Sequence, residues 1–150
     1  MFRGVNNINI DVKGRFGVPS RFREFLTNHC RGEMVVTIDT EDNCLHIYHR
    51  PDMDYIKRRV EDLPSFNAVT RRVQRLLIGH ATDVQMDASG RVLLTPPLRT
   101  YANLDKKGIL IGQGKKMELW DESAWNNKRD IWVEEGQNPG IPEELAGLSL

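Results

Sequence analysis

The chain has 150 residues, of which 39% are hydrophobic and 28% charged, a composition typical of one globular domain or two small modules that share a core. No apolar run approaches the length of a membrane span, and the first residues form no apolar signal region, which argues against membrane insertion and export. The formal net charge is zero and gives no bulk support to a nucleic-acid partner, but residues 1–31 hold six Lys or Arg against two acids.

A strand followed by a tight turn is expected in this basic region. Apolar residues between Val5 and Ile10 lead up to Asp11, and Gly14 tolerates the positive φ that a tight turn needs. The Asp11 carboxylate can accept hydrogen bonds from backbone amides just after it and can reach Arg15, four residues later. This pairing would orient the guanidinium while leaving other donors free.

Two apolar strands and two helices are expected next. Residues 34–36 and 44–48 have strand character, and residues 53–60 place Met53, Ile56 and Val60 on one helical face. Residues 65–81 also predict a helix, since their apolar positions recur at spacings of three and four, with Leu63–Pro64 and Gly79 as breaks. Its arginines, which fall elsewhere on the helix, are typical of a solvated face.

The second half of the chain repeats the first. Residues 87–99 (DASGRVLLTPPLR) match residues 11–23 (DVKGRFGVPSRFR) at an offset of 76, and Gly108 falls opposite Gly32 at the same offset. Residues 116–120 match residues 44–48 at an offset of 72, and a helix containing Trp125 and Trp132 follows. The sequence therefore predicts two copies of strand, turn, strand, helical turn, two strands and helix. After Gly136, Pro139, Gly140 and Pro142 indicate a loosely attached, acidic tail.

The repeated turn has chemistry suited to duplex DNA. Lys13 and Arg15 flank Gly14, and a two-stranded ribbon fits the major groove, where arginine can bind guanine bidentately and lysine can contact phosphate. Arg21 and Arg23 follow on the next turn. The same Asp and Arg could equally serve only to fasten the hairpin. In the second copy Ala88–Ser89 replace Val12–Lys13, and Thr95 stands where the first has Pro19, so unequal contributions are expected. Tight binding by so few cations would need several chains acting together.

A family resemblance is carried by these residues. The opening MFRGVNNINIDVKGRFGVPSRFR, the middle RRVQRLLIGHATDVQMDASGRVLLTPPLRTYANL and the paired D-x-x-G-R motifs resemble the bacterial MraZ family over about residues 1–133. The resemblance implies an AbrB/MazE-like swapped-hairpin barrel made within one chain, ring-shaped oligomers and transcriptional regulation. It further implies repression through short direct repeats in the promoter of the family's own division and cell-wall gene cluster. It assigns DNA contact to Arg15 and Arg91, with Lys13 beside the first.

A catalytic or metal-binding role is the first alternative. The histidines at 29, 46, 49 and 80, with Cys30 and Cys44, have no ligand spacing supported by a second pair, and Cys44-x-His46 alternates along an expected strand. Gly112–Gln113–Gly114 lacks the third glycine of a phosphate loop. We therefore expect no catalytic residues, no cofactor and no metal site, and we expect both cysteines to be reduced thiols.

A protein-interaction module on the same barrel, such as an antitoxin-like partner binder, is the second alternative. The tail contains Ile141, Leu145, Leu148 and Leu150, which could dock on a partner or a neighbouring subunit, although a flexible tail is the commoner outcome. An RNA target is disfavoured because only Phe16 could stack near the hairpin, and Phe16 is expected in the core.

Taken together, the sequence predicts an α+β protein in which two tandem swapped-hairpin AbrB/MazE-like repeats form one pseudo-twofold double-split β-barrel with flanking helices. The expected divisions are residues 5–52 and 81–124 for the repeats, 53–80 for a helical connector and 125–150 for a C-terminal helix and tail. The expected partners are double-stranded promoter DNA and further copies of the chain in a ring, in the cytoplasm on the nucleoid, without membrane or small-molecule substrate. The expected DNA-binding residues are Asp11, Lys13, Gly14, Arg15, Asp87, Gly90 and Arg91.

Overall fold

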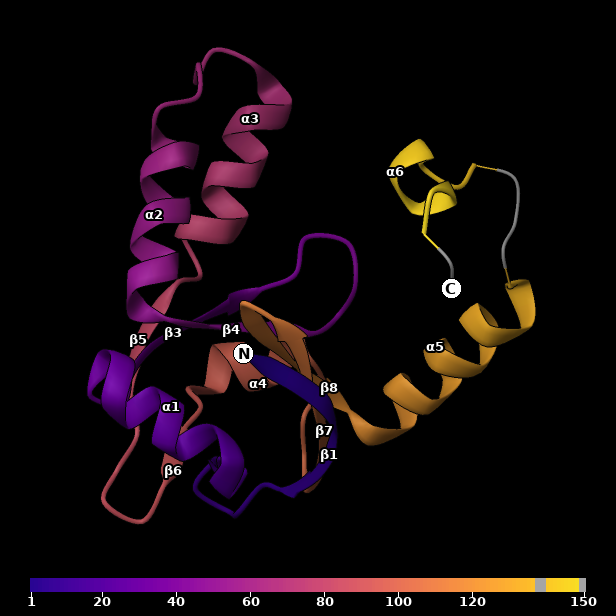
Figure 1. Ribbon diagram of the computed structural model, residues 1–150. Coiled ribbons are helices and arrows are strands. Elements are labelled where there is room, and N and C mark those ends of the chain that lie inside the picture. The colour runs from indigo at the N-terminus through magenta and orange to yellow at the C-terminus, as the bar shows by residue number, and fades with distance from the viewer. Residues whose placement is uncertain (137–139, 149–150) are drawn as a thin grey trace.

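The computed structural model describes residues 1–136 and 140–148, and the predictions for Pro139 and Leu150 lie outside this part (Figure 1). The α+β class is confirmed. The strands are β1 Phe2–Asn9, β2 Arg15–Gly17, β3 Glu33–Ile38, β4 Leu45–His49, β5 Thr82–Gln85, β6 Arg91–Leu93, β7 Lys107–Gly114 and β8 Lys116–Asp121. The helices are α1 Ser20–Cys30, α2 Arg50–Glu61, α3 Ala68–Val73, the π-helix η1 Gln74–Ile78, α4 Pro96–Tyr101, α5 Glu122–Glu135 and α6 Glu143–Ala146.

The strands form one antiparallel six-stranded sheet and one separate two-stranded ribbon. The order in the sheet is β1-β7-β8-β4-β3-β5, and the ribbon pairs β2 with β6. The first strand of each repeat therefore pairs with the other repeat: β1 lies against β7, and β5 lies against β3. Because these exchanged strands are long-range partners, neither repeat can complete its share of the sheet without the other.

The two repeats are related by a pseudo-twofold axis that runs between β4 and β8. Leu45 pairs with Leu119 and Ile47 with Met117, and these two pairs exchange under the repeat correspondence. In the ribbon Phe16 pairs with Val92, its own equivalent at an offset of 76. The internal duplication predicted from the sequence is thus a structural symmetry of strand pairing.

One predicted correspondence between the repeats is wrong. Asn6 pairs with Leu110 and Thr82 with Val36, so Leu110 is the counterpart of Val36 at an offset of 74. Gly108 therefore lies inside β7, whereas Gly32 follows the end of α1 with a φ of 74°. The segment between turn and strand is two residues shorter in the second repeat, where α4 has six residues and its counterpart α1 has eleven.

The strand pairings of the described residues give an open sheet rather than a closed barrel. β1 and β5 are the outer strands of the sheet. Each is followed in the chain by a ribbon strand, β2 or β6, and the backbone links between them are an isolated bridge between Ile10 and Phe16 and the hydrogen bonds of the turns. The ribbon lies over one face of the sheet, and the main core fills the space between them with Phe16, Val92 and Leu119, among others. Continuous hydrogen bonding stops because β2 and β6, at three residues each, pair with one another.

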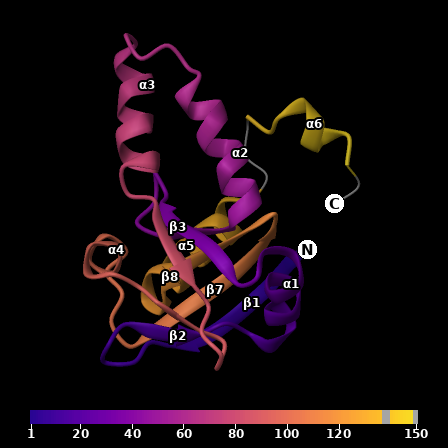
Figure 2. The same cartoon turned by 90° about the vertical axis from the view of Figure 1, so that its left-hand side faces the viewer.

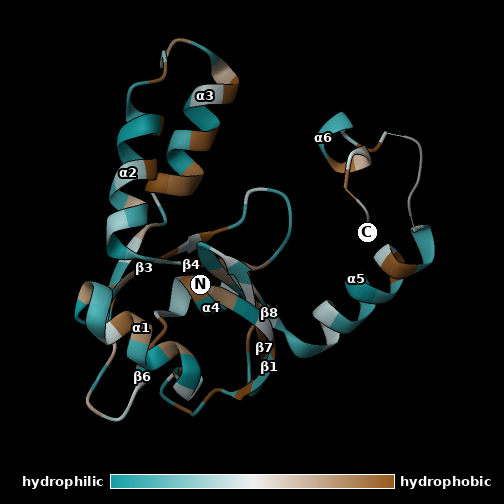
Figure 3. Cartoon of the chain, in the orientation of Figure 1, coloured by the Kyte–Doolittle hydropathy of each residue, from teal (hydrophilic) through white to brown (hydrophobic). Residues whose placement is uncertain are grey.

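Helices α2 and α3 stand away from the sheet as an antiparallel pair (Figures 1 and 2). The predicted helix over residues 65–81 begins at Ala68. The Asn67 side chain caps it by accepting hydrogen bonds from the backbone N–H groups of Val69 and Thr70. The helix ends in the π-helix η1. Apolar residues gather at the end of this helix next to the sheet (Figure 3). None of the described helices has both the length and the apolar composition needed to cross a bilayer.

Candidate nucleic-acid interface

The first repeated turn is built around the Asp11 carboxylate. Its Oδ1 accepts hydrogen bonds from the backbone N–H groups of Lys13 and Arg15, each at 2.9 Å. Its Oδ2 accepts one from Arg15 Nε, also at 2.9 Å. The N–H of Gly14 donates to the Asp11 carbonyl, and Gly14 has a φ of 91°, which suits a residue without a Cβ. Asp11 therefore shapes the turn and fixes the direction of the Arg15 side chain.

The second turn has the same backbone and a looser arginine. Asp87 Oδ1 accepts from the N–H groups of Ser89 at 2.8 Å and Arg91 at 2.9 Å, and Gly90 donates to the Asp87 carbonyl. The Arg91 Nε lies 3.6 Å from Asp87 Oδ2, too far for a hydrogen bond, and this buried nitrogen makes none among the described residues. The two turns therefore differ in how firmly they orient their arginines, and Arg15 is the better oriented of the two.

Within residues 1–136 and 140–148, no hydrogen bond engages the terminal nitrogens of Arg15 or Arg91. Arg15 and Arg91 flank the buried pair Phe16 and Val92 in the ribbon, so strand alternation directs them away from the core. Their side chains are 31% and 41% exposed. They occupy diagonal corners of the ribbon, two residues or about 7 Å apart along it. The outward face of the ribbon therefore presents two cations a short distance apart, of which Arg15 is held by a hydrogen bond.

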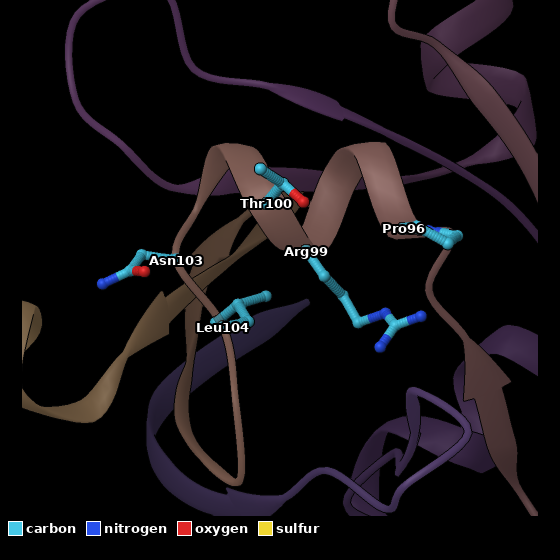
Figure 4. Close-up of a pocket in the computed structure, with 5 residues that line it drawn as sticks. All are labelled: Pro96, Arg99, Thr100, Asn103 and Leu104. Carbon is cyan, nitrogen blue, oxygen red and sulfur yellow. The ribbon is translucent and has the colours of Figure 1, made fainter.

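Each turn is supported by an arginine of the opposite repeat. Arg23 Nε donates to the Val18 carbonyl at 2.6 Å, and its side chain lies against Gly90. Its counterpart Arg99 donates to the Leu94 carbonyl at 3.2 Å and lies against Gly14. Figure 4 shows Arg99 extending from α4 into a hollow that Pro96, Thr100, Asn103 and Leu104 also line. Arg23 is therefore a framework residue and not the freely presented cation that the sequence suggested.

Gly90 is constrained in two ways: by its φ of 77° and by the side chain of Arg23, from the other repeat, which lies against it. Gly90→Ala is expected to cost about 1–3 kcal/mol of unfolding free energy, since a Cβ there would overlap the Arg23 guanidinium as well as strain the backbone. Gly114→Ala is the matched control, because Gly114 has a φ of 81° with no heavy atom within 4 Å of the added carbon. Urea denaturation should show the larger loss for Gly90→Ala. Equal losses would mean that Arg23 does not constrain the turn.

Both aspartates remain ionised around neutral pH. Hydrogen bonding from the Arg15 backbone N–H, and from the Arg15 side chain and the Lys13 backbone N–H, lowers the pKa of Asp11. The Arg91 backbone N–H lowers the pKa of Asp87, helped by Ser89 and by the charges of Arg91 and Arg15. A lowered carboxyl pKa means that the stabilisation is complete above the ordinary value and is lost only as the pH falls through the lowered one. The turns therefore hold their shape across the physiological range.

Other predicted cations are engaged elsewhere in the fold. Arg21 donates to the Asn6 side chain at 2.6 Å and lies over the Phe22 ring, so it fastens α1 to β1. Arg71 donates to the carbonyls of Ser65 and Phe66 before α3. Lys13, at the tip of the first turn, is exposed. The cations available to a ligand at the turns are therefore Lys13, Arg15 and Arg91.

A second group of polar side chains converges on the opposite face of the sheet. Asp39, Cys44, His46 and Glu118 each place a ligand-type atom within 4.8 Å of the others. Cys44 and His46 are recognisable as candidates in the sequence but the whole group is not, because Glu118 lies in the other repeat, far from the three members at positions 39, 44 and 46.

The fold and the turns define a class of protein: a duplicated α+β protein in which the first strand of each repeat pairs with the other repeat and a β-ribbon carries two outward-facing arginines. Comparison with known proteins agrees. Residues 1–76 and 77–131 match the family described as "MraZ protein, putative antitoxin-like". The chain is 53% identical to the transcriptional regulator MraZ of Alkalilimnicola ehrlichii, and 50% identical to those of Coxiella burnetii and Legionella pneumophila. Each match covers all of this chain and all of the relative. The chain belongs to the MraZ family, whose relatives bear the name of regulators rather than of enzymes.

Proposed function

We propose that the protein is a transcription factor that binds double-stranded DNA in a sequence-specific manner through the outward face of the β2–β6 ribbon. The observation that carries this proposal is the tethering of Arg15 by Asp11 through Nε, while its terminal nitrogens make no hydrogen bond within the described residues. Those nitrogens can bind the O6 and N7 acceptors of guanine, a contact worth about 1–3 kcal/mol of discrimination. Lys13 at the turn tip would contact phosphate.

The small number of free cations makes an oligomer part of the proposal. Non-specific affinity for DNA rises with the number of phosphates neutralised, and a single chain of zero net charge offers few. A ring of identical chains would present several ribbons to successive repeats and raise affinity through effective concentration. Direct repeats in the DNA would match a ring better than a palindrome, because neighbouring subunits follow one another in the same direction.

The remaining elements follow from the family. We propose that the DNA target is a set of short direct repeats in the promoter of the protein's own division and cell-wall gene cluster, and that binding represses it. Such a regulator would act in the cytoplasm, on the nucleoid. We also propose the division into repeats 5–52 and 81–124, connector 53–80 and C-terminal segment 125–150, with the exchanged strands β1 and β5 joining the repeats into one unit.

Binding to the protein's own upstream DNA tests the function. The purified full chain should bind that duplex roughly a thousandfold or more tighter than a scrambled duplex of equal length and composition. Fluorescence anisotropy at several salt concentrations measures both affinities, a footprint locates the repeats, and native mass spectrometry counts the subunits. Equal affinity for the two duplexes would contradict the proposal.

A protein-binding role is the second candidate, favoured by the antitoxin-like description of the family and by the exposure of Ile141, Leu145 and Leu148 after α5. If the chain lacks specific affinity for its upstream DNA but is captured in a defined complex with another protein, this candidate replaces the first.

A further inference from the structure

Four potential metal ligands meet on the face of the sheet away from the main core. Asp39 follows β3, Cys44 precedes β4, His46 lies in β4, and Glu118 lies opposite His46 in β8. His46 Nε2 is 2.7 Å from Asp39 Oδ2 and 3.3 Å from Glu118 Oε2. The side chains of His46 and Glu118 are only 11% and 10% exposed. The group therefore lies in a sheltered place rather than among solvated surface acids.

Three of the four side chains are oriented by a second partner on their other polar atom. Asp39 Oδ1 accepts from the backbone N–H groups of Glu41 and Asp42, which leaves Oδ2 directed at the group. Glu118 Oε1 accepts from Trp120 Nε1 at 3.0 Å. The third such contact is the pairing of His46 Nδ1 with the Tyr48 hydroxyl at 3.3 Å. Metal sites commonly hold their ligands through outer contacts of this kind.

Cys44 adds a buried and unpartnered ligand. Its side chain is 0% exposed, and its Sγ makes no hydrogen bond among the described residues. By contrast, the Cys30 thiol donates to the Leu26 carbonyl, as a thiol inside a helix ordinarily does. Burial, with the charges of Glu118 and Asp39, raises the pKa of the Cys44 thiol. A dication bound among these groups would reverse this effect and deprotonate the thiol.

The charges of the group also favour a cation. Two carboxylates lie beside a single imidazole in a sheltered site, so the group can accept further positive charge. We propose that Asp39, Cys44, His46 and Glu118 form a binding site for a divalent transition-metal ion of the zinc type. A thiolate, an imidazole and carboxylates are all established zinc ligands. On binding, bonds form from Sγ, Nε2, Oδ2 and Oε2 to the metal, and the protons of Sγ and Nε2 pass to solvent.

The required rearrangement is small. Ligand atoms around a tetrahedral zinc lie about 3.3–3.8 Å apart, given metal–ligand distances of roughly 2.0–2.3 Å. The present separations include 2.7 and 3.3 Å, and none exceeds 4.8 Å, so the atoms need to move by only about an ångström. His46 and Glu118 are also counterparts under the pseudo-twofold axis, so the ion would link the two repeats at the centre of the sheet. Lys116 occupies the position that corresponds to Cys44, so the symmetry provides one such site and not two.

Metal titration of the full chain tests the site independently of DNA binding. After chelator treatment and dialysis, the protein should take up one equivalent of Zn²⁺ per chain in competition with a chromophoric chelator. Co²⁺ used as a probe should give the charge-transfer absorption of a cobalt–thiolate bond. Cys44→Ser should abolish this absorption and weaken zinc binding at least tenfold, whereas Cys30→Ser, the matched control, should change neither.

Thermal unfolding supplies a second measurement. Zinc should raise the unfolding temperature of the unsubstituted chain and of Cys30→Ser, and should leave that of Glu118→Gln nearly unchanged. Uptake well below one equivalent, absence of the cobalt–thiolate band in the unsubstituted chain, or an unaltered band in Cys44→Ser would each overturn the proposal. The spectrum of the unsubstituted chain decides the matter even if a variant fails to fold.

Discussion

Arg15→Ala is expected to weaken binding to the upstream DNA by about 1–3 kcal/mol per engaged ribbon, or roughly 5- to 150-fold, and to relax discrimination at one base position. The reason is that Asp11 holds the Arg15 Nε at 2.9 Å and directs the rest of the guanidinium outward. Because the side chain is already ordered before binding, its contact with a base costs little further conformational entropy, and the alanine variant loses that contact. Anisotropy titrations with the native and scrambled duplexes measure both effects.

The companion substitutions sharpen this prediction. Arg91→Ala should cost less than Arg15→Ala, since the Nε of Arg91 is 3.6 Å from Asp87 and its guanidinium is less firmly oriented. Lys13→Ala should weaken binding to both duplexes alike and reduce the salt dependence by about one counterion. Arg129→Ala, an exposed arginine on α5 paired with Asp130, is the control and should change nothing. If Arg15→Ala bound with full affinity and unchanged salt dependence, the ribbon would not be part of the DNA interface.

Phe16→Ala is expected to lower the free energy of unfolding by about 3–5 kcal/mol, a large part of the stability of a typical domain. Phe16 is 2% exposed and pairs with Val92 at the middle of the ribbon, where the core of both repeats meets. The lost ring would leave a cavity that the short ribbon could fill only by separating from the sheet. Urea unfolding followed by tryptophan fluorescence measures the loss.

Val12→Ala is the control for that loss. Val12 lies four positions before Phe16 and is 98% exposed, so its truncation should alter stability by less than about 0.5 kcal/mol. A loss below 1 kcal/mol for Phe16→Ala would show that the ribbon is not part of the cooperative core.

The turns were the most predictable part of the molecule. Asp11 and Arg15 lie four residues apart, and their hydrogen bonds join atoms within a single turn, so residue types and spacing are enough to anticipate them. The expectation that Phe16 faces the core is confirmed for the same reason, since strand alternation fixes its side once the turn is placed. The role of Arg23 could not be anticipated from composition, because its contact with Gly90 spans the two repeats.

The buried polar group shows the limit of spacing arguments. Cys44 and His46 lack the second nearby pair that a sequence pattern needs, and their further neighbours come from the loop after β3 and from β8. The pairing of His46 with Glu118 depends on the register of two strands that are far apart in the chain. The β3–β4 hairpin by itself brings Asp39 to His46, but only the assembled sheet adds Glu118.

By itself the sequence indicated the duplication, the α+β class and the tight turns with an aspartate and an arginine four residues apart, because strand and turn signals arise between close neighbours in the chain. The tertiary structure decided which repeat completes which sheet, that the strands form an open sheet with a ribbon across it, and which arginines remain free. These outcomes depend on strand pairing between distant residues such as Asn6 and Leu110. Which strands pair is decided by the burial of one common core, to which both repeats contribute.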